Sequence, residues 1–404
     1  MAKRSGTTGP RVVAGVLALV LYAPSLGSAE REFRRPDGKR MSAASIDREA
    51  NRLLQAARIP GLALALVGDG HVVHMGAYGQ RDIERRLPLD VDTVMPGQSL
   101  TKSAFAYMCM QLVQEGKLDL DRPISEYLRK PLPDYRAYRD LADDERWRKF
   151  TARMLLSHTS GMPNFRWSND NKKLDIKFEP GSRFVYSGEG IRLLQFVLEE
   201  GLGFDVLTEM QSRVLDRFGM RRSGMIWRPD FEGDYAVGHD SEGKALGHRQ
   251  RKRADAASSL DTTIRDYSAF LAGVVRGEGL STDVHREMLR PQIAIVSKHA
   301  FPSHVVDDTD ANRAIALSYG LGWGLFQSPH GLAFFKEGHD DGTDNYALCV
   351  LPRQSCVLML TNSSVGRGVF KYLIDDLLGE TGLPVEWEGF TPYDQATDRP
   401  SPPN

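Results

Sequence analysis

The sequence predicts an α+β fold in which helices flank an antiparallel β-sheet and a mainly helical subdomain is inserted into the chain. Strand-like segments lie near both ends, at 61–78 and 319–361, and the region between them mixes helical patterns with turns and charges. Glycine or proline separates the late strands, as in an antiparallel meander. The expected bounds are 44–387 for the domain, 44–98 and 260–387 for the sheet, and about 99–259 for the helical subdomain.

The early elements follow from the spacing of apolar residues. Residues 42–57 predict a helix, because apolar side chains recur there at helical spacing. Strands are expected at 61–67 and 71–78, with Gly68-Asp69-Gly70 making a hairpin turn between them. A second helix is expected at 99–115, and a glycine directly after it ends it.

The late elements form a series of strands followed by one helix. Turn-forming glycine and proline residues divide this part of the chain into short apolar segments. The expected strands are 319–326, 332–337, 345–351 and 356–361, and the expected helix is 368–378.

Both ends of the chain differ from the globular part. Residues 1–29 resemble an export signal, because basic residues precede an apolar run at 12–23 and small residues suited to cleavage follow. The run is shorter than the roughly 20 residues that cross a bilayer, so we expect cleavage rather than an uncleaved anchor. The mature protein would then have no membrane span and would be periplasmic or secreted. We expect a polar tether at 30–43 and a disordered, proline-rich tail at 388–404.

Composition and motifs exclude several classes of partner and cofactor. The formal net charge of the 404 residues is −1, which gives no long-range attraction to nucleic acid. The basic run at 249–253 is interpreted as a solvated loop. The sequence contains no P-loop, no dinucleotide fingerprint and no G-x-S-x-G elbow. We therefore expect no cofactor and no α/β-hydrolase.

Three cysteines are too few for a disulfide-built scaffold, and their spacing does not indicate a zinc site. Cys349 and Cys356 flank Pro352-Arg353. We expect them to lie directly opposite each other if the turn has two residues, and diagonally if the loop has four. The alternatives are a disulfide and two buried free thiols, and we expect the free thiols.

Ser99 and Lys102 carry the main chemical signal. In a helix, positions i and i+3 share a face, with β-carbons about 5 to 6 Å apart. A lysine can take a proton from serine only when burial lowers its pKa, and the apolar helix behind it provides that burial. Unpaired backbone N–H groups at the helix start would stabilise an oxyanion. A second S-x-x-K, Ser241 to Lys244, lies in a polar loop, so the motif alone is weak evidence.

Four ordered motifs resemble the serine β-lactamase and penicillin-binding-protein superfamily, in particular the branch of class C β-lactamases and related esterases. The resemblance covers about residues 44–380. The motifs are "SLTKSAFAYMCMQLVQEGKLDLDRPISEYL", "LLSHTSGM", "FEPGSRFVYSGEGIRLLQFVLE" and "EGHDDGTDNYALCVLPRQSCVLMLTNSS". The resemblance implies the β-lactamase/transpeptidase-like fold and an acyl-enzyme mechanism.

The resemblance also implies roles for individual residues. Ser99 would be the nucleophile, Lys102 the base or proton relay, and Tyr186 a proton acceptor whose pKa is depressed between two cationic groups. The Ser99 and Gly342 N–H groups would form the oxyanion hole. His158 is expected to stabilise a turn.

Two departures from the family pattern concern substrate binding. Gly188 stands where the family commonly has the asparagine of Tyr-Ser-Asn, so a side-chain amide is missing. The third motif, Lys-Thr-Gly or His-x-Gly in relatives, is interpreted as His339-Asp340-Asp341. Either both aspartates repel an anionic substrate, or they alternate across the strand so that only one reaches the site. Consecutive strand residues cannot converge on one ion, so no metal site is expected.

Three functions follow from these residues. The leading hypothesis is an exported serine hydrolase of esterase, amidase or D-amino-acid-peptidase type, acting on a small-molecule ester, amide or peptide. The second is a β-lactamase or D,D-peptidase with the same mechanism. The third is a binding protein that kept the fold and lost turnover. The oligomeric state does not follow from the sequence.

Overall fold

A nine-stranded antiparallel sheet forms the centre of the computed structural model, which describes residues 1–2, 32–303 and 307–395. Each neighbouring pair of strands is antiparallel. The strands, in spatial order, are β10 (Ile293–Ala294), β11 (Ser318–Tyr319), β12 (Gly324–Ser328), β13 (Gly331–Asp340), β14 (Thr343–Val350), β15 (Ser355–Thr361), β3 (Gly61–Gly68), β4 (His71–Asp82) and β5 (Leu87–Pro88). The expected sheet is confirmed.

Strands from opposite ends of the chain meet inside this sheet. β15 pairs with β3, with Leu358 opposite Ala65 and Val357 opposite Leu66. Successive residues of a strand point to opposite faces, so each of these strands contributes to two apolar cores. The junction between early and late strands is therefore buried on both sides.

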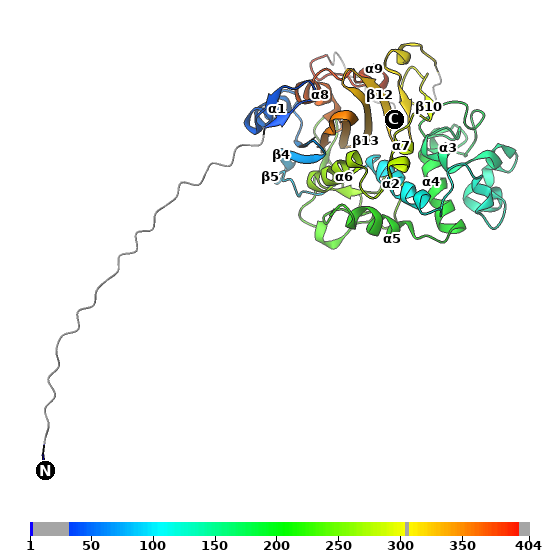
Figure 1. Ribbon diagram of the computed structural model, residues 1–404, viewed down its shortest axis with the longest axis horizontal. Helices are drawn as coiled ribbons and strands as arrows, with labels where there is room; N and C mark the ends of the chain where they lie inside the picture. Colours follow the sequence, from blue (N-terminus) through cyan, green and yellow to red (C-terminus); the bar gives the residue numbers. More distant parts are fainter. Residues whose placement is uncertain (3–31, 304–306, 396–404) are drawn as a thin grey trace. The chain divides into compact units, whose positions relative to one another are not determined.

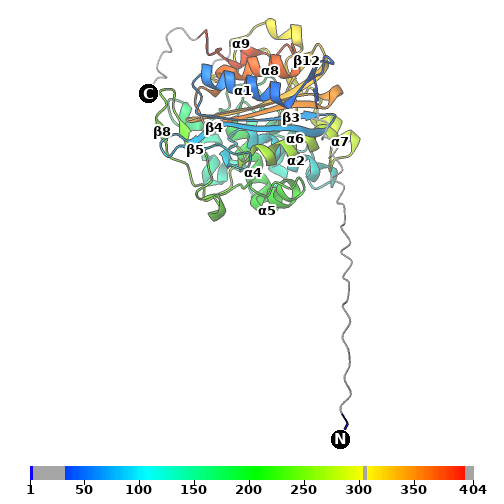
Figure 2. The same ribbon diagram turned by 90° about the vertical axis from the view of Figure 1, so that its left-hand side faces the viewer.

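Helices cover both faces of the sheet (Figures 1 and 2). One face carries α1 (Ala43–Ala56), α8 (Phe370–Leu378) and α9 (Val385–Glu388). The other face carries α2 (Leu100–Gln114) and α6 (Ile264–Arg276). The side chain of Ser42 caps α1 by accepting a hydrogen bond from the Ser45 N–H, in agreement with the predicted helix start.

The inserted region contains short helices joined by turns and 3₁₀ segments. Its helices after α2 are α3 (Ala152–Leu156), α4 (Gly188–Phe196) and α5 (Val206–Met210), and α7 (Thr282–Met288) follows α6. Two small sheets belong to the same side of the molecule: β6 (Met95–Pro96) with β9 (Asp261–Thr262), and β7 (Gly238–His239) with β8 (Ala245–Leu246).

The expected tether and tail are partly structured. Within 30–43, β1 (Phe33–Arg34) pairs with β2 (Arg40–Met41), and Phe33 is buried in the core under α1. Within 388–404, Phe390 packs into the same core. The average composition of both segments is polar or proline-rich, so it did not predict that a few large apolar side chains are buried. Their burial stabilises one conformation of each segment. The expected export signal lies almost entirely outside the described residues.

The cysteine expectation was wrong in two respects. Val350 pairs with Ser355 across the four-residue loop, and this register sets Cys349 directly opposite Cys356 rather than diagonal to it. The two sulfur atoms are joined in a disulfide, 2.15 Å apart. Cys109 is buried in α2 as a free thiol.

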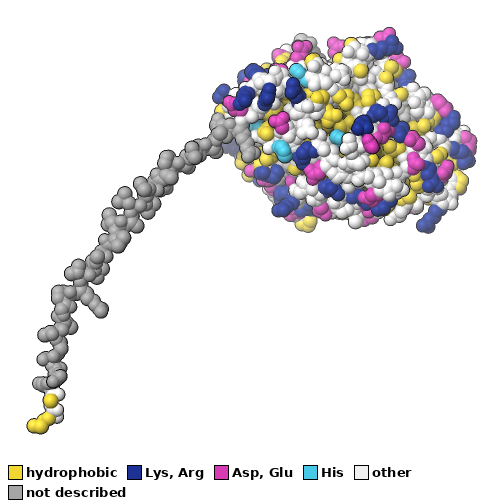
Figure 3. Space-filling model, viewed as in Figure 1, with side chains coloured by type: hydrophobic (Ala, Val, Ile, Leu, Met, Phe, Trp, Pro, Cys, Tyr) yellow, Lys and Arg dark blue, Asp and Glu magenta, His cyan; other side chains and the backbone are white. Residues whose placement is uncertain are grey.

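Charged side chains of both signs are interspersed on the face shown in Figure 3. None of the helices in the described ranges is long and apolar enough to span a membrane. Among the same residues, no three His, Cys, Asp or Glu side chains are arranged to hold a metal ion.

The disulfide predicts how many free thiol groups the protein has, and this number can be measured. The three cysteines of the chain should give one reactive thiol, that of Cys109, when the protein is unfolded without reductant, and three after reduction. Titration with a thiol reagent in denaturant checks this expectation. Three thiols before reduction would show that Cys349 and Cys356 are not joined.

Candidate active site

Ser99 lies at the N-cap position of α2, on a turn that the backbone holds tightly. Gly97 donates its N–H to the Leu260 carbonyl over 2.7 Å, next to the β6–β9 pairing. Gln98 has φ of 50°, in the left-handed region that non-glycine residues rarely adopt. The Ser99 side chain makes no capping hydrogen bond, so its hydroxyl is available to Lys102.

Lys102 is buried beside that hydroxyl, with 2% of its surface exposed. Its Nζ lies 2.9 Å from Ser99 Oγ and donates to the Ala257 carbonyl over 2.7 Å. Burial lowers the pKa of Lys102 well below its ordinary value, and the charge of Lys336 lowers it further. A neutral amine there has a lone pair that can accept the serine proton.

Tyr186 lies between the two lysines. Lys102 Nζ is 5.0 Å and Lys336 Nζ 4.7 Å from the centre of its ring, and Lys336 Nζ donates to its Oη over 2.9 Å. Burial raises the pKa of Tyr186 well above its ordinary value, and the Glu337 charge adds to this. The expected depressed pKa is therefore wrong, because burial and the Glu337 charge together outweigh the hydrogen bond with Ser99, which lowers the pKa of Tyr186. The structure favours a neutral phenol.

His158 supports Tyr186 from behind. Its ring centre is 4.5 Å from that of Tyr186, and its Nδ1 accepts a hydrogen bond from the Ser187 N–H over 3.2 Å. It contacts the backbone of the loop that carries Tyr186, as expected for a residue that stabilises a turn.

Lys336 on β13 is a site residue that the sequence analysis missed. It is completely buried, and besides Tyr186 its Nζ contacts Glu337 Oε1 at 2.5 Å and the Glu337 carbonyl at 3.2 Å. Burial lowers its pKa, and the Glu337 charge opposes that shift. The site therefore contains a second lysine that its own neighbour partly neutralises.

Gly338 shows which segment occupies the third-motif position. A Cβ at Gly338 would lie 2.5 Å from the Gly97 carbonyl oxygen, so only glycine lets β13 pass this close to the turn before Ser99. Lys336-Glu337-Gly338 thus stands where Lys-Thr-Gly was expected, three residues before His339-Asp340-Asp341. Its Lys-x-Gly spacing is the signal that could have identified it.

Gly342 is not placed as an oxyanion donor, because its N–H donates to Ser364 Oγ over 2.7 Å. Asp340 pairs with Thr343 across a two-residue turn, so His339, one position earlier, directs its N–H to the other edge of β13. β12 pairs with that edge only as far as Phe335, within the described residues. The His339 N–H, rather than that of Gly342, therefore points to the open edge beside Ser99.

Asn164 compensates for the glycine at position 188. The Gly188 N–H donates to Asn164 Oδ1 over 3.0 Å. A Cβ at Gly188 would lie only 3.0 Å from that same oxygen, so the Asn164 side chain fills the space beside Gly188. Asn164 also lines the main cavity, which therefore has a side-chain amide from a different loop.

Ser99, Lys102, Tyr186, Asn164 and Glu337 border a cavity of about 710 Å³. Most charges at its wall are paired. Arg192 binds Asp255 at 2.9 Å, and Asp344 lies 3.0 Å from Arg367 and 2.6 Å from His339 Nδ1. Asp340 and Asp341 both line the cavity, and neither is turned fully away from it.

Glu388 of α9 also borders the cavity, although its segment was expected to be disordered. Its Oε1 accepts a hydrogen bond from Tyr346 Oη at 3.1 Å. Burial raises its pKa to about 8, and the Glu337 charge contributes. Its proline-rich surroundings in the sequence gave no sign of this position.

The close approach at Gly338 can be tested by adding one methyl group. Gly338→Ala should reduce the free energy of unfolding by about 1 to 3 kcal/mol, because the new Cβ meets the Gly97 carbonyl. Gly247→Ala is the matched control, because nothing lies within 4 Å of its new Cβ. Denaturant unfolding of both variants measures the difference, and equal effects would contradict the packing described.

Relatives with known sequences match the chain over different shares of their length. The D-aminopeptidase of Brucella anthropi is 30% identical over 172 residues, 41% of this chain and 33% of that protein. Protein flp of Staphylococcus aureus (strain NCTC 8325 / PS 47) is 22% identical over 80% of this chain and 63% of its own length. Penicillin-binding protein 4 of Amycolatopsis lactamdurans is 25% identical over 80% of this chain and 86% of its own length. The chain thus spans only a third of the D-aminopeptidase.

Solved structures share the fold. The octameric penicillin-binding protein homologue from Pyrococcus abyssi has a TM-score of 0.67 at 22% identity, covering 87% of this chain and 80% of its own. The penicillin-binding protein from Bacillus halodurans has a TM-score of 0.61 at 21% identity, covering 78% and 94%. The family model described as Beta-lactamase matches residues 46–378. The protein therefore belongs to the Beta-lactamase family.

Proposed function

We propose that the protein is an exported serine hydrolase that forms an acyl-enzyme on Ser99. Its substrate would be a small ester, amide or peptide, in a reaction of esterase, amidase or D-amino-acid-peptidase type. The observation that carries the proposal is the 2.9 Å contact between Ser99 Oγ and the buried Lys102 Nζ. Family membership supports the same class of reaction.

The mechanism uses Lys102 as the base. Its neutral amine accepts the Ser99 proton while Oγ attacks the substrate carbonyl carbon. The N–H groups of Ser99 and His339 stabilise the oxyanion. The leaving group takes a proton from Tyr186 Oη and departs, and Lys102 returns the proton it accepted to the phenolate. Water then attacks the acyl carbonyl carbon while Lys102 accepts a proton from it, and Lys102 returns that proton to Ser99 Oγ as the carboxylic acid departs.

Two observations support the D-amino-acid-peptide member of this class. The D-aminopeptidase relative is 30% identical over the matched segment, although that segment is a third of its length. The cavity wall also carries the carboxylate of Asp341, which forms no ion pair within the described residues. An unpaired carboxylate favours a substrate with a free amine over an anionic one.

A β-lactamase or D,D-peptidase is the second candidate, and Lys336 favours it. A lysine in the third motif offers a positive charge to an anionic substrate group, and Lys336 occupies that position. Fast acylation by fluorescent penicillin followed by release would select this candidate. Absence of labelling together with ester or D-amino-acid-amide cleavage would select the first.

The third hypothesis is a binding protein without turnover. A missing amide at Gly188 and a third motif of aspartates would both favour loss of catalysis. Asn164 lies beside Gly188, however, and Lys336 stands in the third-motif position, so neither feature supports this hypothesis. Export is supported by the signal-like pattern of residues 1–29 and by the disulfide, since disulfides persist in oxidising compartments.

The nucleophile can be identified by mass. Incubation with a fluorophosphonate, or with a panel of esters, β-lactams and D-amino-acid amides, should add one acyl or phosphonyl group to Ser99. Ser99→Ala should gain no mass, and Lys102→Met should slow acylation by about 10² to 10⁴. Intact-protein mass spectrometry with peptide mapping is the measurement. A modification that persists in Ser99→Ala would refute the proposal.

The pH dependence tests the electrostatic role of Lys336. Acylation needs neutral Lys102, so kcat/KM rises with pH until it passes the lowered pKa of Lys102. Lys336→Met removes a positive charge, which raises the pKa of Lys102 and moves this acidic limb to higher pH. Lys371→Met, on the exposed side of α8, is the control and should leave the limb in place. A limb that stays fixed, or moves to lower pH, in Lys336→Met would contradict the assignment.

A further inference from the structure

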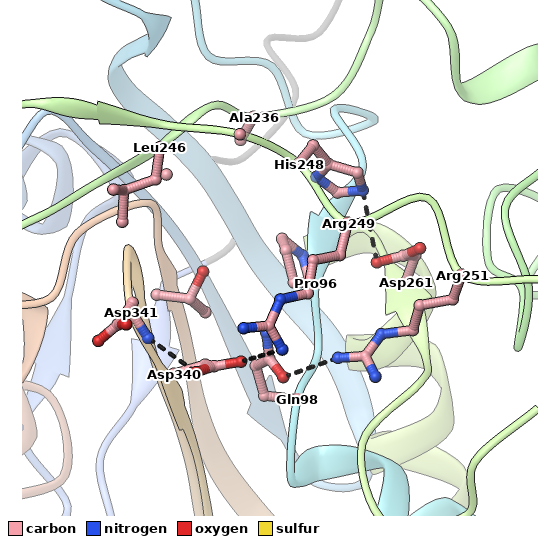
Figure 4. Close-up of a pocket in the computed structure, with 13 residues that line it drawn as sticks. Pro96, Gln98, Ala236, Leu246, His248, Arg249, Arg251, Asp261, Asp340 and Asp341 are labelled. Carbon is pink, nitrogen blue, oxygen red and sulfur yellow. Dashed lines mark hydrogen bonds and ion pairs between the residues drawn. The ribbon is translucent and has the colours of Figure 1, made fainter.

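A second cavity, of about 250 Å³, adjoins the main one (Figure 4). The two share a wall made by five side chains, Gln98, Arg249, Arg251, Asp340 and Asp341. The basic run that the sequence analysis interpreted as a solvated loop thus supplies two of the residues between the cavities. Gln98 directly precedes Ser99, so the shared wall lies next to the nucleophile.

Asp261 lines this second cavity, and one of its two carboxylate oxygens has no hydrogen-bond partner among the described residues. The residue is 2% exposed, and the oxygen without a partner is Oδ2. Its nearest ionic contact is His248 Nε2, 3.9 Å from Oδ1 and beyond hydrogen-bond distance. His248 Nε2 is itself buried without a partner. Asp261 and His248 therefore lie near each other without forming a hydrogen bond.

Other buried carboxylates of the protein are satisfied. Asp344 binds Arg367 and His339, and Asp266 accepts hydrogen bonds from the Arg222 N–H and from Ser223. A buried carboxylate oxygen without a hydrogen-bond partner lowers the stability of the fold. The unsatisfied oxygen of Asp261 therefore calls for an explanation other than stability.

The arginines of the shared wall do not neutralise Asp261. Arg249 lies 3.6 Å from Asp340, and Arg251 donates to Gln98 Oε1 over 3.3 Å and to Ser258 Oγ over 3.2 Å. Figure 4 draws a dashed line from Arg249 to Asp340 and one from Arg251 to Gln98, and none from either arginine to Asp261. Neither arginine is therefore paired with the Asp261 carboxylate.

The geometry suits a primary ammonium group. Asp261 Oδ1 and His248 Nε2 are 3.9 Å apart, so both can lie within about 2.9 Å of one nitrogen atom. An ammonium group has three N–H donors for such acceptors. His248 can accept when its proton is on Nδ1, and its ring is held by Trp227 and Tyr235 at centre distances of 4.8 and 4.7 Å. Pro96, Ala236 and Leu246 line the same cavity and give methylene groups an apolar surface.

We propose that this second cavity is a substrate subsite for a primary ammonium group on a short aliphatic chain, with Asp261 as its counter-ion and His248 as a second acceptor. The proposal rests on the proposed function in one respect, namely that the main cavity next to it is where the substrate reacts. It defines the substrate class as an ester, amide or peptide that carries an aminoalkyl group, such as a basic amino-acid side chain.

Matched substrates test this proposal during turnover. Esters and amides with an aminoalkyl group on either half of the molecule are compared with the same compounds acetylated on the amine. One aminated series should have kcat/KM at least about tenfold above its capped partner, the size of a charge-assisted hydrogen bond. In Asp261→Asn that ratio should fall to about one, and in Asp283→Asn, an exposed control on α7, it should persist. An unchanged ratio in Asp261→Asn would overturn the proposal.

A binding measurement separates this proposal from the proposed function. 1,5-Diaminopentane is titrated by NMR into Ser99→Ala and into Ser99→Ala with Asp261→Asn, and binding should be lost in the second protein. Equal binding to both would overturn the subsite. Loss of binding with Asp261→Asn, in a protein that hydrolyses none of the compounds, would uphold the subsite and refute the hydrolase.

Thermal unfolding without ligand distinguishes a binding carboxylate from a structural one. Asp261→Asn removes a buried unpaired charge and keeps the shape, so its Tm should not fall below that of the unmodified protein. A fall of several degrees would show that Asp261 stabilises the fold and would overturn the proposal.

Discussion

The amine of Lys102, removed from water and in contact with the hydroxyl of Ser99, is the interaction on which the site depends. An amine in that position is useful only while it is uncharged, and burial in α2 supplies this condition. The surrounding fold maintains it. The Ala257 carbonyl orients the amine, and the β6–β9 pairing fixes the turn that carries the serine. The apolar core around α2 is therefore part of the chemistry as well as of the stability.

The second lysine shows how the protein adjusts the first. Lys336 lies on the opposite side of Tyr186 and adds positive charge beside Lys102, while Glu337 limits that charge. Glu388 extends the same group of charges from a helix near the end of the chain. Lys336 and Glu337, on a strand late in the chain, thus influence the protonation state of Lys102 on an early helix. This arrangement needs the sheet that joins early and late strands.

Local patterns in the sequence predicted the elements and the core of the site, whereas contacts between distant segments were not predictable. Ser99 and Lys102 lie one turn apart in a single helix, so their proximity follows from helical geometry. Lys336 was missed because His339 matches the first residue of His-x-Gly in relatives, although no glycine follows two residues later. The close approach of Gly338 and the contact of Lys336 with Tyr186 identify the motif three residues earlier.

Contacts between distant segments also explain the other differences between the predicted and the observed structure. Asn164 reaches Gly188 from a separate loop, which no spacing along the chain shows. Tyr186 was expected to lose its proton readily because nearby charges were considered and the degree of burial was unknown. Phe33 and Phe390 order segments whose average composition is that of a flexible chain.

The protonation state of Lys102 tests the account most directly. The Nζ and Cε signals of isotope-labelled lysines can be followed by NMR across the pH range, and Lys102→Met identifies the signal of Lys102 by its loss. The account predicts that this signal titrates well below its ordinary value of 10.5, so that the amine is largely neutral at the pH where Ser99 is acylated. A lysine that titrates at its ordinary value, and is charged while acylation proceeds, would contradict it.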